Sequence, residues 1–284
     1  MLNTAILCID IWNYHPCKSQ IVKADNLVKK LNPFLEQCYE QSIPIIHMHD
    51  QNLPDKYNFL RLNCPSLEQQ QYYINNIIQS NNNFYKNFTE KLNPTDFNVS
   101  IPHCGKTAIC ECDSIRSCFL KIHPYFKDKM STYNELIKNK SKLKDYCREN
   151  KIKKDDILQQ FQSIHPNLKV NQSDVYLFNL CELYAYLIEN NISNIIYVGG
   201  AGNLCISWTR EYSMFNMKQL GFNTYYIKDY VFNISGNGFD SDINDEDEKY
   251  TQEYFDDMIF ATIEKYYGKS IHQTDVLSNA KLRN

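Results

Sequence analysis

The sequence lacks an excess of either charge, and it lacks any long hydrophobic run. Its 284 residues include 30 Lys and Arg against 33 Asp and Glu, which gives a formal net charge of −3. A protein that neutralises nucleic-acid phosphates needs a basic face, so this balance argues against a nucleic-acid partner. The longest apolar stretches, such as 5–9 and 195–198, are strand-sized and far shorter than the ~20 residues of a membrane-spanning helix. We therefore expect no nucleic-acid partner and no membrane partner.

Cysteine is too sparse for a fold that depends on disulfides. The 11 cysteines are odd in number and make up about 4% of the chain, below the density of disulfide scaffolds. The first apolar segment, 5–9, has no basic region before it and is too short for an export signal. Hydrophobic residues nevertheless reach 43% and aromatic residues 13%, enough for a substantial core. The expectation is a reduced, globular, cytoplasmic protein.

Short apolar runs alternate with helical patterns along the chain. Continuous β-branched and aromatic runs predict strands that are buried on both faces of a parallel sheet, at residues 4–10, 43–49, 194–199 and 223–229. Apolar spacings of three and four predict a helix over 21–35, with a kink or split at Pro33, and a second helix that ends near Asn190. A third apolar stripe begins at Leu204 and stops at Gly221, which suits a helix C-terminus.

This alternation predicts an α/β fold with a doubly wound, mainly parallel sheet and helices on both faces. Residues 81–162 differ from the rest: an asparagine run opens the segment, a cysteine-rich patch follows, and lysine-rich helical text ends it. We interpret 81–162 as a helical or irregular insertion in a single domain that spans 1–284. Such an insertion at the carboxyl edge of the sheet would cover the ligand crevice, either as a lid or as a structural cover.

Two residues stand where a doubly wound fold places its chemistry. Asp10 ends the first predicted strand, although an Asp at that point also suits a simple cap of the next segment. Cys205 follows a strand and the small-residue turn 199–204, and it opens a helix. The positive end of the helix dipole lowers the pKa of such a thiol, and the amides of the turn can form an oxyanion hole. The alternative is that Cys205 is a small buried hydrophobic residue.

The order of these residues resembles that of the isochorismatase-like cysteine hydrolases. In that family a strand ends in Asp, and a later strand leads through a G-V-A-T-N-x-C-like turn into a helix that carries the nucleophilic Cys. This chain has G-G-A-G-N-L-C at 199–205, and Arg210, Gly221-Phe222 and 227–229 follow in the family's order. A subgroup pattern, D-x-W-x-x-H-x-C, is matched by Asp10, Trp12, His15 and Cys17, and its late I-E-K-Y by 263–266. The resemblance extends to about residue 277, with 81–162 poorly matched.

The resemblance implies a six-stranded parallel sheet and an Asp–Lys–Cys triad. Asp10 would take the thiol proton as general base, Cys205 would attack a carbonyl carbon, and the Lys would support the charge. A cis peptide bond would fall between Gly200 and Ala201 and would direct the amides of Ala201 and Cys205 at the oxyanion. Self-association is a further implication.

The chain departs from the family at the Lys of the triad. Alignment of the stretch before Leu183 puts that position at 164–166, so His165 is the candidate for the missing cation or for a proton shuttle. Lys169, nearby, is a second candidate, and His165 as an ordinary loop residue is the third interpretation. The family's Thr in the turn is replaced by Gly202, which predicts a looser turn.

Two further groups of residues have metal-ligating side chains. His47, His49 and Asp50 end the second predicted strand, where some amidases of the family hold a metal with a different spacing. A second set is rich in Cys, but its Cys-x-Cys spacing is tighter than zinc sites favour, and it comprises His103, Cys104, Cys110, Cys112, Cys118 and His123. The acidic run 240–248 suits a solvated loop better than a metal cage. We expect no metal and no cofactor.

The sequence therefore predicts a cysteine hydrolase that acts on a small molecule, with an amide-type C–N bond as the bond cleaved. The expected catalytic residues are Asp10, His165 and Cys205, with Gly200 and Ala201 in the oxyanion turn. One alternative is a catalytically inactive relative that serves as a binding or structural protein, which the missing Lys favours. Another is a metal-dependent hydrolase that uses His47, His49 and Asp50.

Overall fold

The computed structural model describes residues 3–12, 18–48, 53, 55–80, 164–233 and 252–280. The predicted insertion 81–162, with its cysteine-rich patch, lies outside the described residues, as do the acidic run 240–248 and the residues His49 and Asp50. No helix in the described ranges is both long enough and apolar enough to cross a membrane.

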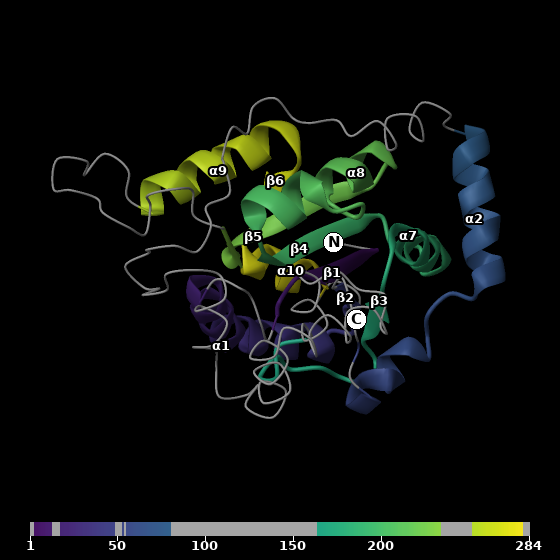
Figure 1. Ribbon diagram of the computed structural model, residues 1–284, viewed down its shortest axis with the longest axis horizontal. Coiled ribbons are helices and arrows are strands. Elements are labelled where there is room, and N and C mark those ends of the chain that lie inside the picture. Colours follow the sequence, from purple (N-terminus) through teal and green to yellow (C-terminus); the bar gives the residue numbers. More distant parts are fainter. Residues whose placement is uncertain are drawn as a thin grey trace, which may run out of the picture.

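The described residues form one six-stranded sheet in the order β3-β2-β1-β4-β5-β6 (Figure 1). All neighbouring strands are parallel. The strands are β1 (Thr4–Ile9), β2 (Ile45–Met48), β3 (Val175–Leu177), β4 (Asn194–Gly200), β5 (Asn223–Phe232) and β6 (Lys269–Ser270). This topology confirms the predicted doubly wound parallel sheet, and four of its strands coincide with the predicted ones. The two outermost strands, β3 and β6, have 3 and 2 residues and were not predicted.

Helices cover both faces of this sheet (Figure 1). They are α1 (Lys18–Glu40), a 3-10 helix η1 (Asp55–Arg61), α2 (Leu67–Ser80), α7 (Leu180–Glu189), a π-helix η5 (Gly202–Thr209), α8 (Met214–Gln219), α9 (Gln252–Tyr266) and α10 (Gln273–Ala280). Apolar side chains of α7, α8 and α9 pack on one face, in a core with Leu7 and Ile9 of β1. Those of α1 and α10 pack on the other face, with Ile6 and Cys8. Alternate residues of β1 therefore supply two cores, as the period of a strand requires.

Helix α1 continues through Pro33 as a single element, where the sequence predicts a kink or a split. Proline removes one backbone hydrogen bond from a helix, and contacts on both sides of Pro33 offset this loss. Leu31 and Phe34 are buried in the core. Asn32 donates a hydrogen bond to the Asn167 carbonyl and accepts one from the Lys169 amide, each of 2.8 Å. Tertiary contacts thus hold this turn of the helix in place.

The third predicted helix is divided into η5 and α8. Arg210, which follows η5, has an extended backbone conformation with φ of −87° and ψ of 148°. Its carbonyl then accepts hydrogen bonds from the Ser213 amide (3.0 Å) and the Asn216 side chain (2.9 Å), so α8 begins on a new axis. Gly221 follows α8 with a φ of 91°, the left-handed conformation predicted for a residue that ends a helix.

Candidate active site

The candidate site lies at the carboxyl ends of β1 and β4, the two central strands of the sheet. The chain passes from β1 to β2 on one side and reaches β4 on the other, so this is the point at which the strand order reverses. Doubly wound folds bind their ligands at such a point. Asp10 follows β1 directly, is fully buried, and has a φ of 50°. Its amide donates to the Met48 carbonyl of β2 (3.1 Å), which fixes the backbone from which the carboxylate extends.

The turn after β4 packs tightly against β1 and β5. Gly199 has a φ of 118°, and a Cβ there would lie 2.0 Å from the Ile9 carbonyl oxygen. A Cβ at Gly202 would lie 2.3 Å from Asn233 Oδ1. The sequence predicted a looser turn at Gly202, but the turn is tightly packed, because the space of a side chain is already filled. The peptide bond between Gly200 and Ala201 is cis, as the resemblance implies.

Cys205 lies in the first turn of η5, as the sequence predicts, and is 8% exposed. The Ala201 carbonyl, at the N-terminal cap of this helix, accepts hydrogen bonds from the amides of Leu204 (3.1 Å) and Ile206 (3.0 Å). The bond from Ile206 spans the wider turn of a π-helix, a form that is frequent at functional sites. Cys205 is thus held near the N-terminal end of this helix.

Asp10, Cys205 and Arg210 form one cluster of polar side chains. Two nitrogens of Arg210, Nε and a terminal nitrogen, donate to Asp10 Oδ2 at 3.0 and 2.8 Å. Burial raises the pKa of Asp10 above its ordinary value, while the Arg210 charge and a hydrogen bond from the Cys205 side chain lower it. For the other carboxylate oxygen, Oδ1, which is buried, the described part of the chain supplies no partner within hydrogen-bond distance. A carboxylate, a thiol and a guanidinium therefore meet at the carboxyl edge of the sheet.

Arg210 is the residue of this cluster to which the sequence analysis assigned no role. The resemblance includes Arg210 only as one of the residues that follow the turn 199–205. The apolar stripe that begins at Leu204 predicted a regular α-helix across it. In a helix of 3.6 residues per turn, a residue five positions after Cys205 lies on a different face. The pairing with Asp10 depends instead on the π-helix and on the extended backbone of Arg210. The signal available in the sequence is a lone Arg within an apolar stripe.

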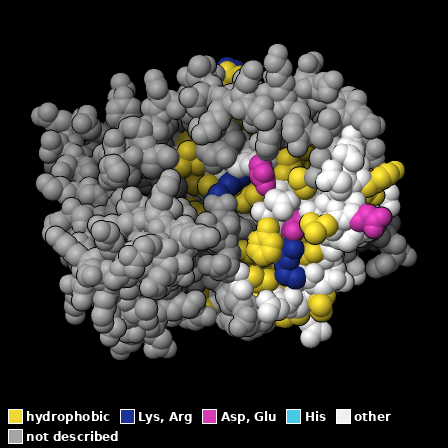
Figure 2. Space-filling view, turned by 45° about the vertical axis from the view of Figure 1, so that its right-hand side comes forward, with side chains coloured by type: hydrophobic (Ala, Val, Ile, Leu, Met, Phe, Trp, Pro, Cys, Tyr) yellow, Lys and Arg dark blue, Asp and Glu magenta, His cyan; other side chains and the backbone are white. Residues whose placement is uncertain are grey.

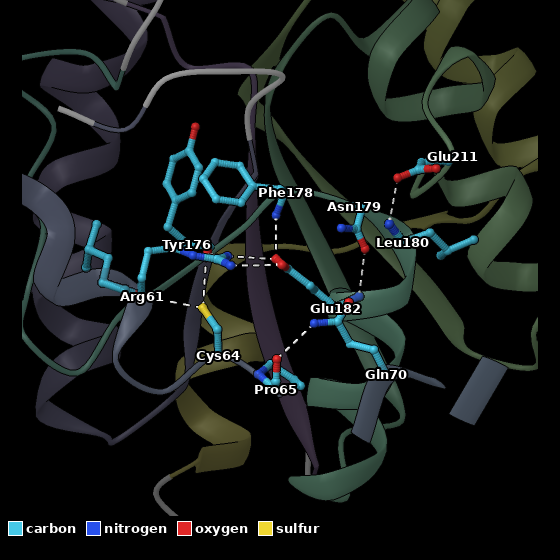
Figure 3. A network of polar contacts seen from close by, with 11 residues as sticks. Arg61, Cys64, Pro65, Gln70, Tyr176, Phe178, Asn179, Leu180, Glu182 and Glu211 are labelled. Atoms are coloured by element: carbon cyan, nitrogen blue, oxygen red, sulfur yellow. Dashed lines mark hydrogen bonds and ion pairs between the residues drawn. The ribbon is translucent and has the colours of Figure 1, made fainter. Parts of the chain in front are cut away.

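A second polar network includes Glu211, the residue that follows Arg210 in the chain (Figure 3). The Leu180 amide, in the first turn of α7, donates to Glu211 Oε1 at 2.6 Å. Glu182 of the same helix accepts two hydrogen bonds from Arg61 of η1, at 2.7 and 2.8 Å. The Arg61 guanidinium also lies 4.2 Å from the centre of the Phe178 ring. These bonds tie the residue after Arg210 to α7, and α7 to η1.

The surface on the side of α7 reflects this arrangement. Figure 2 shows acidic and basic side chains next to one another, surrounded by hydrophobic ones. Arg210 is 19% exposed and Arg61 28%, whereas their carboxylate partners, Asp10 and Glu182, are buried. The carboxylates thus lie beneath their cations.

His165 lies beside the end of β1, but its ring is engaged with α1. Its amide donates to the Ile11 carbonyl (2.9 Å). In the ring, Nε2 lies 2.9 Å from Asp25 Oδ1, and Nδ1 accepts a hydrogen bond from the Asn167 amide at 3.3 Å. These bonds hold the ring of His165 against α1. Lys169, the second candidate, is about half exposed and forms an ion pair with Glu36 of α1.

His47 lies in β2 beside β3 and is part of a buried cluster with the residues just before β3. Its Nε2 lies 2.9 Å from Asp174 Oδ2, and the Tyr39 hydroxyl donates to the same oxygen at 2.8 Å. Within the described ranges, no three His, Cys, Asp or Glu side chains are placed to hold a metal ion. His49 and Asp50, the residues proposed to bind a metal together with His47, lie outside these ranges.

Comparisons with known proteins find similarity at the level of the fold. No family model and no curated protein matches the chain. Among solved structures, the chain is similar to a cysteine hydrolase from Pseudomonas syringae pv. phaseolicola, with 11% identity over 100% of this chain and 94% of that one and a TM-score of 0.46. An isochorismatase family protein from Burkholderia thailandensis has 13% identity over 98% and 96%, with a TM-score of 0.45. An N-carbamoylsarcosine amidase from Thermoplasma acidophilum has 10% identity over 96% and 97%, with a TM-score of 0.40. At these identities and TM-scores, the argument for an activity rests on the residues of the site itself.

Proposed function

We propose that the protein is a cysteine hydrolase that cleaves an amide-type C–N bond of a small molecule. The observation that carries this proposal is the contact of the Asp10 carboxylate with the Cys205 thiol and the Arg210 guanidinium. The three groups lie at the carboxyl ends of the central strands, and the thiol lies at a helix N-terminus. A nucleophile, a base within reach of its proton and a charge that orients the base are the parts of a covalent hydrolase.

In this mechanism Asp10 removes the proton of Cys205, and the thiolate attacks the carbonyl carbon of the substrate. The tetrahedral oxyanion accepts hydrogen bonds from the amides of Ala201 and Cys205. Asp10 returns the proton to the departing nitrogen, so that an amine leaves and a thioester remains. A water molecule then gives a proton to Asp10 and attacks the thioester. The carboxylic acid leaves as the proton returns to the sulfur of Cys205.

Arg210 takes the place of the family's Lys in this proposal. Burial raises the pKa of Asp10 and so favours its protonated form, which cannot act as a base. The guanidinium opposes this effect, since its charge lowers the pKa of Asp10. Both of its hydrogen bonds go to Oδ2, which leaves Oδ1 to exchange the proton. His165 then has a positioning role, because its bonds to Asp25 and Ile11 attach its loop to α1 and β1.

A non-catalytic relative is the second candidate, and one observation favours it. The two hydrogen bonds from Arg210 stabilise the ionised form of Asp10, and a carboxylate stabilised in this way is a weaker base. If Asp10 does not take the thiol proton, Cys205 is an ordinary buried thiol and the site binds a ligand without reaction.

The test is the rate of Cys205 alkylation by iodoacetamide as a function of pH, followed by mass spectrometry. Cys181 is the matched internal control, because it also lies in the first turn of a helix. Burial and the neighbouring Glu211 raise the pKa of Cys181. We expect selective labelling of Cys205 with an apparent pKa below the ordinary thiol value of about 8.5.

Two variants locate the base. We expect Asp10→Asn to abolish the selective labelling of Cys205, and His165→Ala to leave the shape of its pH profile unchanged. Loss of the profile in His165→Ala would return His165 to the catalytic role that the sequence predicts. A wild-type Cys205 that reacts no faster than Cys181 would favour the non-catalytic protein.

A further inference from the structure

The Tyr212 hydroxyl is buried and has no hydrogen-bond partner among the residues that the structure describes. Tyr212 lies two residues after Arg210, between η5 and α8, and is 2% exposed. Its ring packs in the same core as Cys205 and Ile206. Buried hydroxyl groups in native proteins nearly always have a partner, and an exception calls for a physical reason. A ligand that is bound in the working protein would supply one.

Other buried tyrosines of the structure show the usual arrangement. The Tyr197 hydroxyl of β4 donates to the Tyr212 carbonyl at 2.9 Å. The Tyr226 hydroxyl of β5 donates to the Phe260 carbonyl at 3.4 Å. The bond from Tyr197 also anchors the backbone of Tyr212, so the side chain extends from a fixed point. The unpaired hydroxyl is therefore not a consequence of a loosely held residue.

Tyr212 belongs to the cluster around Cys205. Its phenol interacts electrostatically with Asp10, Arg210 and Cys205: burial raises its pKa, the Asp10 charge raises it further and Arg210 lowers it. Asp10 Oδ1 is the second buried oxygen of this cluster for which the described ranges hold no hydrogen-bond partner. When Asp10 is ionised, its Oδ1 can only accept a hydrogen bond, whereas the Tyr212 hydroxyl can donate one. A molecule with both an acceptor atom and an N–H group satisfies both.

The charge of the cluster indicates the kind of molecule. Arg210 is paired with Asp10, and it is further stabilised by the charge of Glu211. Its charge is thus already balanced by two carboxylates, which disfavours an anionic ligand in the same place. An uncharged polar molecule avoids this repulsion.

We propose that the Tyr212 hydroxyl binds the acceptor oxygen of an uncharged substrate in the site of Asp10 and Cys205, and so determines the specificity of that site. This inference rests on the proposed function, because the substrate is the molecule whose carbonyl Cys205 attacks. The hydroxyl donates to the substrate, while Asp10 Oδ1 accepts from its N–H group. Tyr212 is then a binding residue, and Arg210 and Asp10 keep the roles given above.

Two thiol reagents, one that alkylates sulfur and one that forms a mixed disulfide with it, test this role without knowledge of the substrate. Iodoacetamide is uncharged and has both a carbonyl oxygen and an N–H group, whereas methyl methanethiosulfonate has no amide and reports the availability of the thiolate. We expect Tyr212→Phe to lower the rate of Cys205 alkylation by iodoacetamide about tenfold, the effect of one hydrogen bond. In the same variant, we expect the rate at which Cys205 reacts with the methanethiosulfonate to stay unchanged. The wild type also prefers iodoacetamide to the anionic iodoacetate by a larger factor than the variant does.

Tyr197→Phe is the matched control, since it removes a buried hydroxyl that has a partner. We expect this variant to melt at a lower temperature and to keep the wild-type ratio of the two rates. Tyr212→Phe, which removes a hydroxyl without a partner, keeps or raises the melting temperature. The two variants therefore separate binding from folding.

Three results would overturn the inference, in distinguishable ways. If Tyr212→Phe lowers the rates of Cys205 modification by both reagents by the same factor, the residue acts on the thiol rather than on the substrate. If Tyr212→Phe melts at a lower temperature than the wild type and keeps the wild-type ratio of the two reaction rates, the hydroxyl of Tyr212 is structural. If wild-type Cys205 reacts no faster than Cys181 with the methanethiosulfonate, the proposed function itself fails. In the first two cases that function stands and Tyr212 alone loses its role.

Discussion

Two buried aspartates flank strands of the sheet, one before β3 and one after β1, and they differ in what surrounds them. Asp174, which directly precedes β3, is 1% exposed. One of its oxygens, Oδ2, lies within hydrogen-bond distance of the Tyr39 hydroxyl (2.8 Å), His47 Nε2 (2.9 Å) and the Asn171 amide (3.0 Å). These groups come from α1, β2 and the turn before β3. The carboxylate therefore joins separate parts of the scaffold.

Asp10, at the carboxyl edge, accepts two hydrogen bonds, of 3.0 and 2.8 Å, from Arg210. Its neighbour is the thiol of Cys205, and Arg210 is partly exposed. The comparison shows that burial alone does not tell a structural carboxylate from a reactive one. Asp174 connects elements of the fold, whereas Asp10 has a polar neighbour that can exchange a proton with it.

The sharpest test of this contrast is to remove Asp174. We expect Asp174→Ala to lower the free energy of unfolding by about 3–5 kcal/mol, because it leaves buried donors unpaired. Urea unfolding measures this loss, and the pH profile of Cys205 alkylation in the folded variant stays as in the wild type. Asp174→Asn, which keeps an acceptor oxygen, loses less stability. If the alkylation profile disappears in a folded Asp174 variant, the two aspartates are not independent.

Two glycines, one at the end of β4 and one before β5, offer a second test. A Cβ at Gly199, at the carboxyl edge, would meet the backbone oxygen of Ile9, whereas Gly221, before β5, has nothing within 4 Å of the Cβ position. Both have a positive φ. We expect Gly199→Ala to cost about 3 kcal/mol of unfolding free energy and Gly221→Ala about 1 kcal/mol, since only the first adds a collision to the backbone strain. Equal losses would show that the turn after β4 can rearrange.

The third and smallest effect is a shift in the pH dependence of Cys205 alkylation, which follows the pKa of Asp10. Burial raises the pKa of Asp10 above its ordinary value of 3.8. The fold thus favours protonated Asp10, and the stability that this gives is present at low pH and is lost as the pH rises through the folded-state pKa. The proposed base must be ionised, so the acid limb of Cys205 alkylation lies above the ordinary pKa of aspartate.

Arg210→Gln removes the charge that opposes this effect of burial. We expect the acid limb to move about one pH unit higher, because an adjacent opposite charge lowers the pKa of a carboxyl. Arg210→Lys restores most of the shift, which separates charge from packing. Alkylation rates between pH 4 and 9 measure it, and a limb that stays in place or moves lower would show that Arg210 does not control Asp10.

Local pattern accounts for much of the fold. The four strands with long apolar runs were predicted because a strand that is buried on both faces needs such a run. Strands β3 and β6 are too short to show any period. The break between η5 and α8 was missed because the apolar spacing continues across Arg210, while the conformation of that residue depends on contacts outside the helix.

By itself, the sequence determined the class of fold and placed Asp10 and Cys205 at the ends of strands, because hydrophobic period and small-residue turns are local properties. Only the tertiary structure decided which side chains surround them. Arg210 pairs with a carboxylate 200 residues away, and His165, which the alignment offered as the cation, bonds to Asp25 instead. The unpaired hydroxyl of Tyr212 is likewise visible only in the folded core. Such partners depend on the order of the strands and the axis of each helix, which no short segment of the chain specifies.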